Sequence, residues 1–326
     1  MIKLVENEML KIVRKKKIIV VAMIIVVLVS LFTYAQYRET ERTQKKFGDV
    51  DWRVTLQQEI IDTQNRLTSS GISDEWKKEL NLRVQQQQYY LDHNINPSDP
   101  GAPTIVRAFA EHAISLLLPL LVMIIGSDII SSELSAGTVK ILLTRPIKRW
   151  RILLSKYLAL LLSVSLIVVL FALLSYFISG MVFGYQGWNA PIITGFSTNA
   201  GELNAGAADI IPQWKYIVME YSLVWFVMVV VGTLSFMVSV LIKNTSAGMG
   251  VMLAALISGV ILSSVVSSWE SAKYLFMINL DLTSYLAGNP PPIEGMTLGF
   301  SLVVLSIWGL AALLVSFGVF VRKDMY

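Results

Sequence analysis

Long, almost uncharged apolar stretches limit the fold of this chain more than any other feature of its sequence. Hydrophobic residues make up 54% of the 326 residues and charged residues only 15%, a balance that no water-soluble domain of this size needs to fill its core. A helix of about 20 apolar residues crosses the hydrocarbon core of a bilayer. We expect such helices at residues 18–35, 106–130, 151–183, 215–242, 247–266 and 297–321. The sequence therefore predicts an all-α membrane protein with six transmembrane helices.

The first 17 residues precede the first apolar stretch and mix apolar with basic side chains. Ile2, Val5, Met9 and Ile12 recur at steps of three and four residues, the period of one helix face. We expect residues 1–17 to form an amphipathic helix on the membrane surface. The alternative is a solvated basic leader, since the apolar stripe is short.

Residues 36–105 are charged and rich in glutamine, which indicates a domain in water between the first two spans. Two helices are predicted within it, at 54–67 and 74–91, with a turn of serines and glycine between them. We expect a helical hairpin with contacts between Leu56, Ile60 and Leu67 on one helix and Trp76, Leu80 and Tyr90 on the other. The hairpin is either a self-packed insert or a surface for a partner or substrate.

Three further features concern the spans and the links between them. Pro119 lies inside the second span and predicts a bend there. Residues 184–214 are rich in Gly, Asn, Ala and Pro, and we expect an irregular loop. Residues 243–246 are expected to form a short turn between the fourth and fifth spans.

Residues 267–296 contain an apolar run that is too short to cross a bilayer. This run, 274–286, also includes Asn279 and Asp281, whose polar groups are costly inside a membrane. We therefore expect a re-entrant or interfacial segment on the outer side.

Basic residues concentrate on one side of the predicted membrane. They occur in residues 1–17, in the segment 131–150, at Lys243 and in the tail 322–326. The two shorter loops on the opposite side, counted as 184–216 and 267–295, contain one lysine each and more acidic residues. By the positive-inside rule, we expect both termini to be cytoplasmic, in the plasma membrane of a bacterium, and the hairpin to lie outside the cell.

Several classes of active site are not indicated. The chain has no cysteine and only two histidines, so we expect no metal site. No P-loop, GxSxG or HExxH motif occurs, so neither enzyme activity nor a bound cofactor is expected. A net charge of +4 does not indicate nucleic-acid binding. Asp128 and Glu133 match a paired aspartyl site poorly, and Glu111 with His112 fits a hydrated interface better than a proton relay.

The segment 131–150 is short, basic and amphipathic, and it separates the second and third spans. Its candidate functional residues are Glu133, Gly137, Thr138, Leu142, Leu143, Arg145, Pro146 and Arg149. The leucines suit an apolar groove, the arginines suit acids at its rim, and the proline fixes the direction in which the third span leaves. This pattern, together with Lys156, resembles permease subunits of ATP-binding-cassette (ABC) transporters of the type-two exporter family. The N-terminal segment is similar to the surface helix before the first span in that family, at Glu8, Lys11, Arg14 and Lys15.

The resemblance implies that 131–150 contains a cytoplasmic coupling helix, which docks on a separate ABC ATPase subunit. That partner would bind the ATP, and two permease subunits, identical or different, would form the transporter in contact with membrane lipid. The expected function is export of an amphipathic substrate, such as a lipid-like molecule or an antimicrobial peptide. The sequence identifies no residue of the substrate path.

Two alternatives come from the same residues. Segment 131–150 could instead be a basic loop held on anionic lipid. The alternative function is that of a non-transporting membrane sensor or immunity protein, which binds a ligand through its external helical hairpin.

Overall fold

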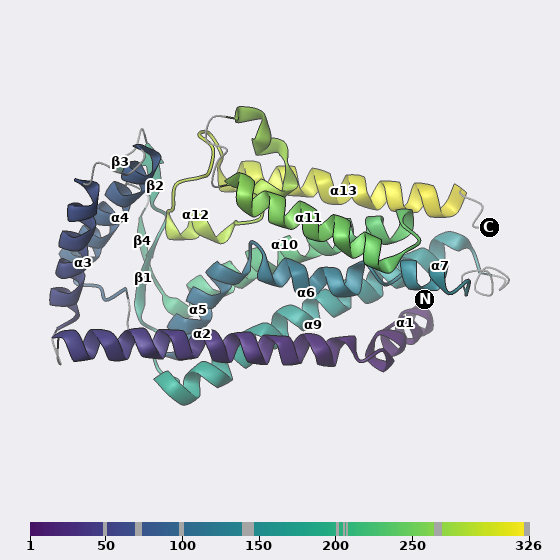
Figure 1. The fold of residues 1–326 in the computed structure, drawn as a ribbon, viewed down its shortest axis with the longest axis horizontal. Coiled ribbons are helices and arrows are strands. Elements are labelled where there is room, and N and C mark those ends of the chain that lie inside the picture. Colours follow the sequence, from purple (N-terminus) through teal and green to yellow (C-terminus); the bar gives the residue numbers. More distant parts are fainter. Residues whose placement is uncertain are drawn as a thin grey trace.

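The computed structural model describes residues 1–47, 51–68, 74–97, 101–138, 147–199, 202–204, 206, 208–263 and 269–322. Within these ranges six helices are long and apolar enough to cross a membrane, which confirms the expected all-α membrane fold. Helix α1 (Ile2–Arg14) and the last residues of α13 (Leu298–Arg322) lie at one end, called here the terminal end. Helices α3 (Trp52–Leu67) and α4 (Asp74–Asp92) lie at the opposite, hairpin end (Figure 1).

The first span belongs to a helix that is longer than predicted. Helix α2 (Lys17–Phe47) has 31 residues and a length of about 46 Å, which exceeds the hydrocarbon core of about 30 Å. The sequence between Ala35 and Phe47 contains no glycine or proline to end the helix, so the helix continues toward α3. Lys16, with a φ of 56°, separates α2 from α1.

The second span is broken into three helices. They are α5 (Ala102–Ala113), α6 (Leu117–Gly126) and α7 (Ser131–Ser135). The bend predicted from Pro119 is confirmed, and the break lies just before it, at residues 114–116. A proline is tolerated in the first turn of a helix, where its missing N–H has no helical partner, so Pro119 fits the start of α6.

The predicted hairpin is confirmed as a pair of packed helices, α3 and α4. Leu56, Ile60 and Leu80 are buried, as expected. Trp76 is 60% exposed, so it is not part of the buried core of the hairpin, and its expected contact with α3 stays a prediction. The serine and glycine turn lies outside the described residues. A hydrogen bond of 2.9 Å from Gln86 Nε2 to the carbonyl of Gly288 joins the hairpin to the segment before α13.

The prediction of an irregular loop at 184–214 is wrong. Strand β1 (Pro191–Thr194) pairs antiparallel with β4 (Asp209–Pro212), and β2 (Ser197–Asn199) pairs antiparallel with β3 (Glu202–Asn204). Ile192 and Ile193 pair with Ile211 and Ile210, and β-branched residues favour strands. These isoleucine pairs outweigh the glycine and proline content of the segment.

Helix α10 (Gln213–Leu241) lies at the centre of the bundle. It packs against α5, α6, α9 (Arg149–Phe183), α11 (Thr245–Ser263) and α13. Helices α6 and α10 approach closely, since a Cβ added to Gly126 would lie 2.7 Å from the Cβ of Ser235. The expected short turn is confirmed between the end of α10 and the start of α11.

The segment 269–296 consists of short helices, η2 (Glu270–Tyr274), η3 (Phe276–Asn279) and α12 (Thr283–Ala287). None of these three helices exceeds five residues, so none is long enough to cross a membrane. This agrees with the expectation that residues 274–286 do not form a seventh crossing. Asn279 donates two hydrogen bonds of 2.8 Å to the carbonyls of Lys273 and Leu275, which satisfies its amide nitrogen.

Candidate coupling site

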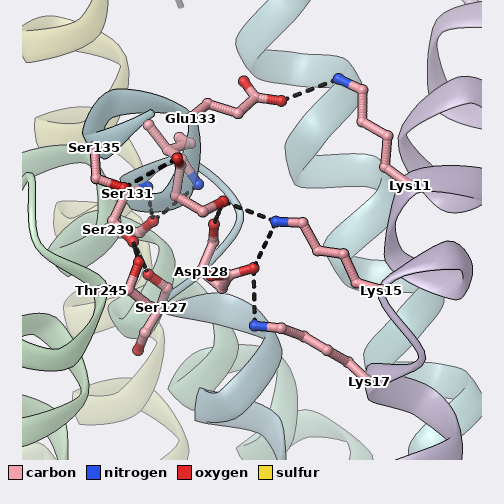
Figure 2. Close-up of polar contacts among 12 residues, drawn as sticks. Lys11, Lys15, Lys17, Ser127, Asp128, Ser131, Glu133, Ser135, Ser239 and Thr245 are labelled. Atoms are coloured by element: carbon pink, nitrogen blue, oxygen red, sulfur yellow. Dashed lines mark hydrogen bonds and ion pairs between the residues drawn. The ribbon is translucent and has the colours of Figure 1, made fainter. Parts of the chain in front are cut away.

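Glu133, the first candidate residue of segment 131–150, lies on α7 and pairs with two lysines from distant parts of the chain. Its Oε1 is 3.0 Å from Nζ of Lys11 on α1 and 2.8 Å from Nζ of Lys156 on α9. Figure 2 shows Lys11 pointing across to Glu133. One carboxylate therefore joins α1, α7 and α9.

Glu8 completes a closed group of four charges. Its two carboxylate oxygens lie 2.7 Å from Lys11 Nζ and 2.8 Å from Lys156 Nζ. Glu8, Lys11, Glu133 and Lys156 are called here the four-charge network. The two positive and two negative charges sum to zero, so the group contains no uncompensated charge, which would be costly in free energy inside the protein.

The network is buried around Lys156 and reaches the surface at Lys11, whose side chain is 38% exposed. The Lys156 side chain is only 1% exposed and that of Glu8 is 11% exposed. Burial lowers the pKa of Lys11, but hydrogen bonds and charge attraction from Glu8 and Glu133 outweigh this effect, and the net pKa lies above the usual 10.5. Lys11 is therefore charged at neutral pH. Removing the buried Lys156 costs about 3–5 kcal/mol, because its partners stay buried with a surplus negative charge, whereas removing Lys11 costs less because solvent screens it.

A second group of ion pairs fixes the junction between α1 and α2. Asp128, in the turn between α6 and α7, accepts contacts of 2.8 Å from both Lys15 and Lys17. Lys15 also donates to Ser132 Oγ at 2.9 Å, and Figure 2 shows Lys15 and Lys17 both pointing at Asp128. A cavity of about 610 Å³ lies beside these charges, between α1 and the end of the second span.

The opposite side of α7 is attached to α10 and α11. Ser239 Oγ accepts hydrogen bonds from the backbone N–H groups of Ile130 and Ser131, at 3.0 and 2.9 Å. The first N–H groups of a helix have no helical acceptor, so Ser239 supplies the partner that the start of α7 lacks. The hydroxyls of Ser131 and Thr245 are 2.9 Å apart. The end of the second span is thus held from both sides.

The structure places half of the candidate coupling residues. Glu133 is in the four-charge network, and Thr138 Oγ1 donates to the Glu133 carbonyl at 3.3 Å. Gly137 has a φ of +69°, the left-handed conformation that glycine favours after a helix end. Arg149, at the start of α9, donates to the carbonyl of Val321 on α13 at 3.4 Å. The other four candidates, Leu142, Leu143, Arg145 and Pro146, lie outside the described residues.

The pairing partners were not predicted from the sequence, although each left a signal. Lys156 is a charge inside an apolar span, and such residues face a partner in the bundle. Glu8 and Lys11 are three residues apart, which places them on one helix face. The predicted N-terminal helix is confirmed, and part of its apolar stripe is packed against protein, since Ile12 is only 8% exposed and Val5 and Met9 contact the core, whereas Ile2 is 84% exposed.

Comparison with known proteins places the chain in a family. Residues 79–326, from α4 to the C-terminus, match the model of a family described as "Protein of unknown function (DUF2705)". The chain belongs to this family. The DUF2705 chain is similar to proteins of Bacillus subtilis (strain 168).

Two such relatives are similar over most of their length. The "Uncharacterized protein YhcI" is 29% identical over 278 residues, which cover 84% of each chain. The "Uncharacterized membrane protein YdbK" is 25% identical over 219 residues, which cover 65% of this chain and 80% of YdbK. The membrane description of YdbK agrees with the six long apolar helices found here, and the DUF2705 chain is a multi-pass membrane protein.

Proposed function

We propose that this chain is the membrane-spanning permease subunit of an ATP-driven ABC exporter. In this proposal the terminal end is cytoplasmic, in a bacterial plasma membrane, and a separate ABC ATPase subunit docks there. A second permease subunit completes the transporter, and the substrate is amphipathic, such as a lipid-like molecule or an antimicrobial peptide. The proposal rests on the resemblance of segment 131–150, and the geometry on either side of that segment supports it.

The observation that carries the proposal is the anchoring of both ends of segment 131–150. On one side, Glu133 is fixed by Lys11 and Lys156 at 3.0 and 2.8 Å. On the other, Arg149 starts α9, whose Lys156 closes the same four-charge network. A force applied by a partner between these two anchors is transmitted to α1, α7 and α9 together. A loop that merely rests on lipid headgroups needs no such buried anchors.

The mechanism follows from this arrangement. Closure of the ATPase subunits around ATP would move segment 131–150, and the buried ion pairs would carry α1 and the end of the second span with it. Ser239 would pass the displacement to α10, which packs against five other helices of the bundle. The bundle would then change the side to which the substrate path opens.

Copurification tests the proposal. The tagged chain is purified from the membranes of its native host, and recovery of an ABC ATPase subunit with it is measured. Leu142→Asp combined with Arg149→Glu should abolish recovery, because it places a charge in the apolar contact and reverses another at the rim. Lys215→Glu, an exposed charge reversal at the hairpin end, is the control and should retain the ATPase.

Two outcomes would contradict the proposal. One is full recovery of the ATPase with the double variant. The other is ATPase activity in the purified chain alone, which would place the nucleotide site in this protein. If no ATPase copurifies under any condition and deletion of residues 54–91 abolishes function, the sensor hypothesis is favoured.

A further inference from the structure

A second cluster of ionisable side chains lies at the hairpin end, far from the candidate coupling residues. Arg107 and Glu111, one turn apart on α5, are 3.4 Å from each other. Tyr216 on α10 donates from its hydroxyl to the same Glu111 oxygen at 3.4 Å, and its ring lies 5.6 Å from the guanidinium carbon of Arg107. Arg107 also donates to the carbonyl of Pro97 at 3.5 Å. Arg107 and Glu111 therefore neutralise each other in charge, although the Arg107 Nε is buried without a hydrogen-bond acceptor among the described residues.

Glu220, one turn after Tyr216 on α10, is the exception in this cluster. Its side chain is fully buried, with 0% exposure. Neither carboxylate oxygen has a hydrogen-bond donor among the described residues. The hydroxyl of the adjacent Tyr221 is also buried without a partner there. The sequence did not single out Glu220, whereas it did point to Glu111.

The groups around Glu220 leave it without a counter-ion of its own. Arg107 and Glu111 are the charged groups that act on it, and Arg107 is already paired with Glu111. Helices α6 and α11, which pack against α10, carry no titratable side chain, and the charged residues of α9 and α13 lie at the terminal end. Further ionisable side chains at the hairpin end include Tyr90 on α4 and, outside α3 and α4, His112, Tyr176, Asp209, Lys215, Asp281 and Tyr285.

The burial of the Glu220 carboxyl without donors determines whether it is ionised or protonated. An ionised carboxylate without donors or counter-ion costs many kcal/mol in a protein interior, so such a group binds a proton instead. A protonated carboxyl is neutral and loses only ordinary hydrogen bonds. An ionised Glu220 would also give the cluster of Arg107, Glu111 and Glu220 a net negative charge.

We propose that Glu220 is a proton-binding site, occupied in this conformation, and that Arg107 exchanges between Glu111 and Glu220 when the proton leaves. Release breaks the O–H bond of the carboxyl, leaves the electron pair on the carboxylate and passes the proton to water. Water reaches the cluster at Arg107 and Glu111, whose side chains are 18% and 25% exposed. The new carboxylate attracts the guanidinium, which weakens its pair with Glu111. Proton occupancy is thereby linked to the relative position of α5 and α10.

Thermal unfolding of the full-length chain at several pH values tests this site. Glu220→Gln resembles the protonated carboxyl in shape and charge and should unfold at the wild-type temperature at low pH. If Glu220 holds its proton in the folded state, as proposed, and releases it at neutral pH when the chain unfolds into water, then raising the pH favours unfolding. The unfolding temperature of Glu220→Gln should therefore exceed that of wild type by a margin that grows with pH. Glu270→Gln, an exposed control, should show no such growth.

Infrared spectroscopy of the wild type supplies a test that needs no variant. The folded protein at neutral pH should show the C=O band of a protonated carboxyl, and this band should be absent from Glu220→Gln and present in Glu270→Gln. Absence of the band from the wild type overturns the proposal, as does its persistence in Glu220→Gln. The proposal is also overturned if the difference in unfolding temperature between Glu220→Gln and the wild type stays constant or falls as the pH rises. None of these readouts involves an ATPase, so failure here is separate from failure of the proposed function.

Discussion

Replacing Lys156 with methionine should destabilise the protein strongly. Methionine retains most of the apolar stem, but the change leaves Glu8 and Glu133 with only Lys11 between them. Because Lys156 is 1% exposed, solvent does little to screen the loss, and the expected cost is about 3–5 kcal/mol. At roughly 2 °C per kcal/mol for a large domain, the unfolding temperature should fall by about 6–10 °C.

The assay is thermal unfolding in detergent, with Lys148→Met as the control, since Lys148 is exposed at the start of the same helix. Adding Glu8→Gln to the Lys156→Met variant removes the surplus negative charge and leaves Glu133 paired with Lys11. The double variant should regain part of the loss, with a coupling energy of about 0.5–3 kcal/mol. Equal unfolding temperatures for the Lys156 and Lys148 variants would refute the reasoning.

Three further predictions concern other described contacts. Ser239→Ala leaves two backbone N–H groups at the start of α7 without an acceptor and should lower the free energy of unfolding by about 1–3 kcal/mol, measured by thermal unfolding. Ser222→Ala, at an exposed position of α10, the helix that carries Ser239, should change the free energy of unfolding by less than about 0.5 kcal/mol. Asp128→Asn weakens the attachment of α1 and should speed hydrogen exchange in residues 2–14, and unchanged exchange there would contradict the assigned ion pairs. Desolvation on one side raises the pKa of Glu59 above the usual 4.5, so its contribution to stability, kept small by the exposed other side, is complete below that pH and is lost as the pH rises through the raised value. Glu59→Gln should remove this part of the pH dependence of hairpin stability, measured by hydrogen exchange of α3 and α4. The control variant Glu79→Gln, at an exposed position of α4, should leave that pH dependence unchanged.

The spanning helices were predictable because their signal is local. A run of about 20 apolar residues is sufficient to indicate a span, and Pro119 was sufficient to indicate a bend. The end of the first helix was not predictable from hydropathy, because α2 continues into polar sequence as far as Phe47. The paired strands in 184–214 were missed because their isoleucines are separated by turn-forming residues that dominate the composition.

The candidate site was only partly predictable because its decisive contacts are distant in sequence. Lys11 and Glu133 are 122 residues apart, and Glu8 and Lys156 are 148 residues apart. A single sequence shows that each of these charges is present but not which one neutralises which. The same limit applies to Glu220, which resembles any other polar residue near the start of a span until its burial and missing donors are known.

Distance measurements between spin labels test the central claim most directly. The chain has no cysteine, so pairs can be introduced at Arg14 with Lys148, and at Lys148 with Glu270, all exposed positions. In the complex with the ATPase subunit, binding of a non-hydrolysable ATP analogue should leave the first distance unchanged, because the four-charge network holds α1 against α9. The second distance should change as the hairpin end rearranges. A change in the first distance, or no change in the second, would contradict the role of this network as a rigid joint between ATP binding and the membrane helices.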